Sequence, residues 1–144
     1  MNLGAFSIIS IIEGDDTGMT FRDYRGLAAK HPWLAIFMAL FMLSLAGFPP
    51  TAGFIAKYGL LSAATAKGYI WLVIIAVVNT LLSAYYYLRL IVNMYMENED
   101  DIVEPTYAGL NHVFIGLLAL MILLLGITPG FLLEIAEKTS VTVF

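Results

Sequence analysis

Long apolar stretches without charges alternate with short charged stretches along the chain. The stretches that contain no Asp, Glu, Lys or Arg are 1–12, 31–56, 68–88 and 105–133. A bilayer's hydrocarbon core is about 30 Å thick and needs ~20 apolar helical residues, a length that three of these stretches reach. The pattern therefore predicts an all-α protein built as a multi-pass transmembrane helical bundle.

The same pattern predicts where the helices lie. We expect the end of a helix at 1–12, a broken transmembrane helix at 33–67, and transmembrane helices at 69–96 and 110–133. The first segment is too short to cross a bilayer alone. It also lacks the basic residues that begin a signal peptide, so we do not interpret it as one. We interpret its abrupt apolar start as the tail of a longer helix, so that the chain is the later part of a larger membrane domain.

The segment 33–66 is too long to be one ordinary spanning helix. Its 34 residues would form a helix of about 51 Å. The sequence GFPPTAG interrupts it between Gly47 and Gly53. Pro49 and Pro50 remove two backbone donors, and the flanking glycines make an irregular backbone easier still.

We therefore predict two half-helices, at about 33–47 and 53–66, joined by an unwound stretch. Irregular backbone at membrane depth persists only where protein or a water-filled cavity satisfies its polar groups. Transporters place ion sites at such discontinuous helices. The alternative interpretation is a plain proline kink in a packing helix, because the same residues would also produce one.

Lys57 lies in the second predicted half-helix, four residues after Gly53 and eleven before Gly68. Eleven residues correspond to about 16 Å, which places the lysine near the bilayer midplane. A lysine there costs roughly 2.5–3.5 kcal/mol to insert, so it should face the protein interior. Burial and the positive end of the second half-helix favour the neutral amine, whereas the negative end of the first steadies the charged one. This balance predicts a group that transfers protons; the alternative is a structural lysine paired with an acid on another helix.

A few further polar residues lie on the predicted membrane helices. Asn79, Ser83 and Tyr86 recur at helical spacing and could support a water path near Lys57, although interhelical hydrogen bonding is the more common reason for such a pattern. His112 opens the last predicted helix and could relay protons, or it could have a structural role at the helix entrance. These four residues are candidate support for a proton path.

Composition narrows the possible functions. Hydrophobic residues make up 60% of the chain and charged residues only 12%, whereas soluble domains have about 25% charged residues. The absence of cysteine excludes thiolate metal sites, disulfides and iron–sulfur ligation. The sequence contains no glycine-rich phosphate loop, metal-ligand cluster or nucleophilic triad, so we expect no bound cofactor, no metal and no nucleic-acid partner.

The distribution of basic residues predicts the orientation of the bundle. Four of them fall on one side of the predicted membrane and two on the other. The larger group is Arg22, Arg25, Lys30 and Arg89, and the smaller is Lys67 and Lys138. Cytoplasmic loops carry an excess of Lys and Arg, so the loop that contains residues 22–30 is expected in the cytoplasm.

Two stretches of the sequence resemble a known family. The runs LAAKHPWLAIFMALFMLSLAGFPPTAGFIAK and NTLLSAYYYLRLIVNMYM are similar to the later part of subunit N of proton-translocating NADH–quinone oxidoreductase, respiratory complex I. The SLAGxPPTAGFxxK element with YYYLR and a following MYM is specific in combination, and the resemblance covers almost the whole chain. The chain departs slightly from the motif at Ala56, where glycine is common in the family.

The resemblance implies an antiporter-like fold of fourteen helices with inverted repeats, of which this chain would contribute the C-terminal part. It implies that Lys57 lies on the route by which protons leave, in a multi-pass subunit of the inner cell membrane beside other membrane subunits, with lipid, water and protons as further partners. FMN, iron–sulfur clusters and quinone would be bound by other subunits. The chain would thus be a non-redox part of a proton-pumping enzyme, with no catalysis of its own.

Two other interpretations fit part of the pattern. A subunit of a multi-subunit cation/proton antiporter would share the broken helix and its lysine, without a redox partner. A truncated membrane fragment without transport would share the bare apolar start. An enzyme acting on a soluble substrate has no residues to support it.

Overall fold

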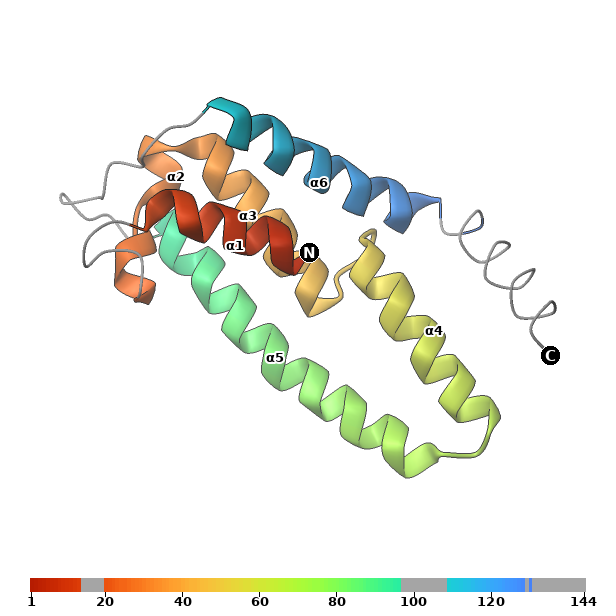
Figure 1. Ribbon diagram of the computed structural model, residues 1–144. Helices are drawn as coiled ribbons and strands as arrows, with labels where there is room; N and C mark the ends of the chain where they lie inside the picture. Colours follow the sequence, from red (N-terminus) through yellow and green to blue (C-terminus); the bar gives the residue numbers. More distant parts are fainter. Residues whose placement is uncertain (14–19, 97–108, 129, 131–144) are drawn as a thin grey trace.

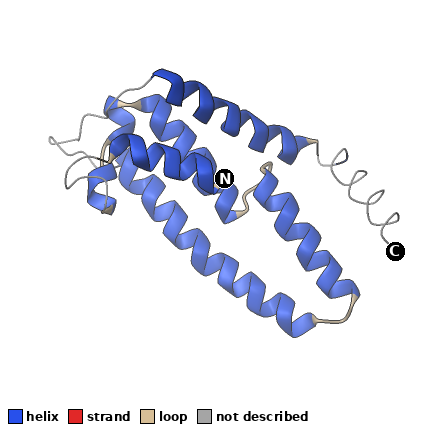
Figure 2. Ribbon diagram, viewed as in Figure 1, coloured by secondary structure: helices blue, strands red, loops and turns tan. Residues whose placement is uncertain are grey.

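The computed structural model describes residues 1–13, 20–96, 109–128 and 130, and only the backbone of 109–112. Every regular element in these ranges is a helix (Figure 2). In chain order the elements are α1 (Asn2–Ile12), the short 3₁₀ helix η1 (Phe21–Tyr24), α2 (Leu27–Lys30), α3 (Pro32–Ala46), α4 (Ala52–Ala66), α5 (Ile70–Met96) and α6 (Gly109–Ile127). The predicted all-α bundle with one discontinuous helix is confirmed.

The predicted segments correspond closely to these helices. The range 1–12 coincides with α1, and the range 33–67 holds α3 and α4 with the break between them. The range 69–96 coincides with α5. The range 110–133 begins within α6 but continues into residues that lie outside the described part of the chain.

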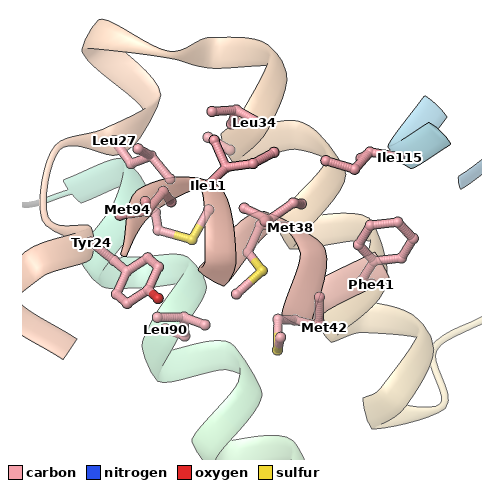
Figure 3. Close-up of a cluster of buried hydrophobic side chains, with 14 of the residues drawn as sticks. Ile11, Tyr24, Leu27, Leu34, Met38, Phe41, Met42, Leu90, Met94 and Ile115 are labelled. Carbon is pink, nitrogen blue, oxygen red and sulfur yellow. The ribbon is translucent and has the colours of Figure 1, made fainter. Parts of the chain in front are cut away.

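The buried core lies where α1, α3 and the end of α5 meet (Figure 3). Phe41 and Met38 on α3, Ile8 on α1 and Met94 on α5 are each at most 1% exposed. Gly4 on α1 allows the contact, because a Cβ there would run into the ring of Phe41. The two helices therefore pack closely at this point, which fixes α3, the first half of the broken helix.

Helix α6 covers the same core with one face. Its buried residues recur every three or four positions, which is the period of a helix face. They are Ile115, Ala119, Ile122 and Gly126. Helix α6 thus runs along the bundle from the core to the start of α4 (Figure 1).

Helices α4 and α5 form a hairpin that extends away from the core (Figure 1). Among the described side chains, α4 buries only Gly53, and the buried residues of α5 lie near its C-terminal end. Trp71 is 79% exposed and Ile75 is 68% exposed, although both are apolar. Within the described ranges, α5 is the helix that is long and apolar enough to cross a membrane, and α1, α3 and Val113–Ile127 are shorter apolar helices.

The segment before α3 folds back onto the end of α5. The backbone N–H of Thr20 donates to Asp23 Oδ2 at 2.7 Å, which closes the first turn of η1. The guanidinium of Arg89 on α5 lies 5.8 Å from the centre of the Phe21 ring. Tyr24 is 5% exposed, and burial, with smaller contributions from the negative charges of Asp23 and Glu13, raises its pKa from 10.0 to about 12.

Candidate functional site: a lysine at a helix break

The break between α3 and α4 forms where the sequence predicted it. Helix α3 ends at Ala46, helix α4 begins at Ala52, and residues 47–51 between them are irregular. Gly47 adopts the left-handed conformation with φ of +85°, which favours glycine because a side chain there is strained. Thr51 is buried, and its hydroxyl donates to the Phe48 carbonyl at 2.7 Å, which stabilises the turn into α4.

The end of α3 leaves carbonyls that need hydrogen-bond donors. The last four carbonyls of a helix have no partner within it. Two of them are satisfied by the backbone of the turn, since the N–H of Phe48 donates to Leu43 at 2.9 Å and that of Gly47 donates to Ser44 at 3.1 Å. This pair of bonds is the Schellman arrangement that commonly ends helices. The carbonyls of Leu45 and Ala46 remain.

Lys57 satisfies these two carbonyls. Its Nζ donates to the Leu45 carbonyl at 2.9 Å and to the Ala46 carbonyl at 3.0 Å. The lysine reaches from α4 back across the break, so its amine lies at the negative end of α3, where a cation is favoured. The amine therefore has partners inside the protein, and these partners are backbone carbonyls.

Two glycines bring the pieces of the break into close contact. A Cβ at Gly53 would collide with the carbonyl of Ser44, so the first turn of α4 lies directly against the last turn of α3. A Cβ at Gly126 on α6 would collide with the carbonyl of Pro50 and with the backbone of Thr51. The end of the irregular stretch thus lies against α6 and the start of α4 lies against α3, while Phe48, Pro49 and Pro50 are exposed.

A pocket of about 170 Å³ opens beside the amine, between α4 and α5. Gly47 and Lys57 lie on its α3–α4 side, where the rings of Phe54 and Tyr58 stack with centroids 6.0 Å apart. Helix α5 contributes Val77, Thr80 and Leu81. One water molecule occupies about 30 Å³ in liquid water, so the pocket has room for several waters.

The four residues predicted to support a proton path are not gathered at this pocket. The described lining residues of α5 do not include Asn79, Ser83 or Tyr86. Asn79 directly precedes Thr80 and therefore lies about 100° from it around the helix. Asn79 and Tyr86 are exposed, and Ser83 donates to the Asn79 carbonyl within its own helix. His112 lies in the first turn of α6, and its side chain lies outside the described residues.

Sequence reasoning missed Thr80 because it followed the polar residues with the most conspicuous spacing. Thr80 is flanked by Asn79 and by apolar residues, so no group of polar residues marks the face of α5 that meets Lys57. The signal that could have found it is the three- to four-residue spacing of Val77, Thr80 and Leu81, which identifies one helix face. In the described part of the chain, no three His, Cys, Asp or Glu side chains are arranged to hold a metal.

Comparison with known proteins supports the resemblance that the motifs indicated. The chain is 43% identical over 133 residues to NADH-quinone oxidoreductase subunit N 1 of Thermodesulfovibrio yellowstonii, covering 92% of this chain and 28% of that protein. It is 44% identical over 145 residues to NADH-quinone oxidoreductase subunit N of Trichlorobacter lovleyi, covering 96% of this chain and 29% of that protein. The chain thus spans less than a third of the length of these relatives.

A solved structure and a family model give the same assignment. A chain in the structure of respiratory complex I from Thermus thermophilus with bound aureothin matches with a TM-score of 0.81 and 31% identity, over 91% of this chain and 30% of that one. The model of the family described as NADH:quinone oxidoreductase/Mrp antiporter, transmembrane, matches residues 1–83. More than half of the chain is therefore covered by one family model, and the chain belongs to the NADH:quinone oxidoreductase/Mrp antiporter family of transmembrane proteins.

Proposed function

We propose that this chain forms part of a proton-translocating membrane subunit of NADH–quinone oxidoreductase, and that Lys57 carries the proton. The observation that carries this proposal is the Lys57 amine, which is held by the Leu45 and Ala46 carbonyls at a helix break and lines a pocket. Similarity to subunit N proteins and to a chain of complex I supports the assignment to that enzyme.

The two carbonyl bonds are compatible with gain and loss of a proton. A lysine ammonium has three N–H donors, whereas the neutral amine has two donors and a lone pair. The Leu45 and Ala46 carbonyls use two donors. Both can therefore remain satisfied in either protonation state, and only the third position of the nitrogen changes. That position is available to the pocket, where the proton would leave or arrive.

In this proposal the chain transfers protons and takes no part in electron transfer. FMN, iron–sulfur clusters and quinone would belong to other subunits, which would influence Lys57 through conformation or charge. The chain would cross the inner cell membrane several times beside those subunits, with the 22–30 loop on the cytoplasmic side. The excess of Lys and Arg in that loop supports this orientation.

A cation/proton antiporter is the second candidate, because the family description includes Mrp antiporters. Such a protein would use the same break and lysine, but an ion gradient would drive it. The relatives named above are subunits of NADH-quinone oxidoreductase, which favours the first candidate. Proton uptake that depends on NADH and not on a sodium gradient would separate the two.

The test replaces Lys57 by arginine in the full-length subunit, within membranes that contain the intact complex. Arginine keeps donors for the two carbonyls but holds its proton at every accessible pH. We expect the complex to assemble and proton transfer through this site to slow by on the order of 10², the factor lost with a proton-transferring group. The measurement is the quenching of a pH-sensitive dye in inverted vesicles during NADH oxidation.

Lys67 provides the matched control for this experiment. It is a lysine on the same side of the break, at the end of α4, and it is exposed. Lys67→Arg should leave proton uptake per NADH oxidised unchanged. If Lys57→Arg pumps as well as Lys67→Arg, Lys57 carries no proton and the proposal fails.

A further inference from the structure

We propose that Thr80 is a positioning residue that holds a water molecule against the Lys57 amine. This inference rests on the proposed function of Lys57 as a proton carrier and specifies the group on the facing helix that assists it. Thr80 and Lys57 line the same pocket from opposite sides, one on α5 and the other on α4. The water between them would be the first acceptor of the proton after it leaves the amine.

The pocket offers a water few polar partners. Of its described lining residues, Lys57, Tyr58 and Thr80 have polar side-chain atoms, and the other side chains are apolar. Tyr58 also lines the pocket, but it belongs to the same helix as Lys57 and is 64% exposed. Thr80 is partly buried and comes from the facing helix. It is therefore the side chain best placed to complete a site that Lys57 begins.

The hydroxyl of Thr80 is arranged to accept a hydrogen bond. Its proton is directed to the Ala76 carbonyl, with Oγ1 2.8 Å from that oxygen. The lone pairs of Oγ1 remain as acceptors. The third N–H of the Lys57 ammonium needs an acceptor, and a water can supply one while donating its own hydrogen to Oγ1. The two groups thus complement each other through a single water.

This arrangement makes the water an ordered one. Buried waters are held by two to four polar partners, and an apolar cavity stays dry. Lys57 and Thr80 together supply two partners, whereas Lys57 alone supplies one. Without the Thr80 hydroxyl, α5 would present only apolar side chains to the amine, and the proton would have no acceptor on the facing helix. The rate of proton transfer should therefore depend on a hydroxyl at position 80.

The test compares Thr80→Val with Thr65→Val in the full-length subunit of the intact complex. Valine has nearly the shape of threonine and lacks only the hydroxyl. Thr65 makes the same type of bond within α4, from Oγ1 to the Leu61 carbonyl at 2.8 Å, but is not among the described residues that line the pocket. We expect Thr80→Val to lower proton uptake per NADH oxidised roughly fivefold, the factor that one hydrogen bond is worth. Thr65→Val should have no effect, and Thr80→Ser should restore uptake.

Rescue by serine separates positioning from packing, because serine restores the hydroxyl and not the methyl group. If Thr80→Val does not assemble, Thr80→Ala and Thr80→Ser, both smaller than threonine, carry the same comparison. Equal pumping by Thr80→Val and Thr65→Val, with pumping lost in Lys57→Arg, overturns the role of Thr80 and leaves the proposed function intact. Normal pumping in Lys57→Arg overturns the proposed function itself, and the role of Thr80 with it.

Discussion

Two glycines end helices in the same motif, but only one of them contacts Lys57, so comparing their alanine variants isolates the effect of that contact. Gly47 ends α3, and Gly68 ends α4, with φ of +85° and +79°. Both helices end in the Schellman arrangement, because Tyr69 donates to the Ala64 carbonyl just as Phe48 donates to that of Leu43. The difference lies in the surroundings: a Cβ at Gly47 would lie 2.9 Å from Cδ of Lys57, and a Cβ at Gly68 would meet nothing within 4 Å.

Alanine at either position should cost about 1–2 kcal/mol, because a side chain is strained in the left-handed conformation. Gly47→Ala has a second effect. Two carbon atoms prefer a separation of about 3.5–4.0 Å, so the Lys57 side chain must move by roughly 0.6–1.1 Å. Its amine, 2.9 Å and 3.0 Å from the two carbonyls, lies at the end of this flexible side chain, so the movement strains these two bonds. The complete loss of one bond from a charged group would add about 1.5–3 kcal/mol, which is the upper limit of this second effect.

The two variants should therefore differ in both stability and transport. We would measure the temperature at which the solubilised full-length subunit unfolds, together with proton uptake per NADH oxidised in vesicles. Gly68→Ala should show a modest loss of stability and normal pumping, whereas Gly47→Ala should be less stable and pump poorly. If the two variants are destabilised by the same amount and pump equally well, Gly47 is required only for its backbone conformation. The contact with Lys57 then affects neither stability nor proton uptake.

Two further predictions follow from the packing. Gly53→Ala should destabilise the subunit by about 1–3 kcal/mol, because its Cβ would collide with the Ser44 carbonyl. Gly59→Ala, on the open face of the same helix, should be neutral or stabilise the subunit by up to about 1 kcal/mol. Equal melting temperatures of the two variants would contradict this prediction. Tyr24 stays protonated in the folded state up to about pH 12 but ionises near pH 10.0 when unfolded. The free energy of unfolding should therefore decrease by about 3 kcal/mol as the pH rises from 10.0 to about 12. Tyr24→Phe should abolish this decrease when unfolding is measured from pH 9 to 12, and the same pH dependence in the variant and the unsubstituted protein would refute the prediction.

The fold was predictable from the sequence because membrane helices leave simple signals. Uncharged stretches of sufficient length gave the helices, and the GFPPTAG interruption gave the break between α3 and α4. The position of Lys57 at the break also followed from counting residues along a helix. These features depend on local composition and length, which the sequence records directly.

The partners of Lys57 and the facing side of α5 were not predictable in this way. The sequence indicated that the amine needs a partner, but the bonds to Leu45 and Ala46 depend on the angle at which α4 returns towards α3. The rotation of α5 decides that Thr80 lines the pocket, and tertiary packing sets that rotation. An apolar helix with exposed residues on most of its surface carries little information about which face meets its neighbour.

The break and the lysine each solve a problem that the other creates. An interrupted helix inside a membrane leaves carbonyls without donors, and each costs several kcal/mol in hydrocarbon. An ammonium at the same depth costs energy unless polar groups surround it. The Leu45 and Ala46 carbonyls supply those groups, and the amine supplies the donors, so a charged residue becomes tolerable at a depth where it is otherwise expelled. The role of Lys57 as a cap is therefore compatible with the proton transfer that we propose, because the amine would give up its third proton and still hold both carbonyls.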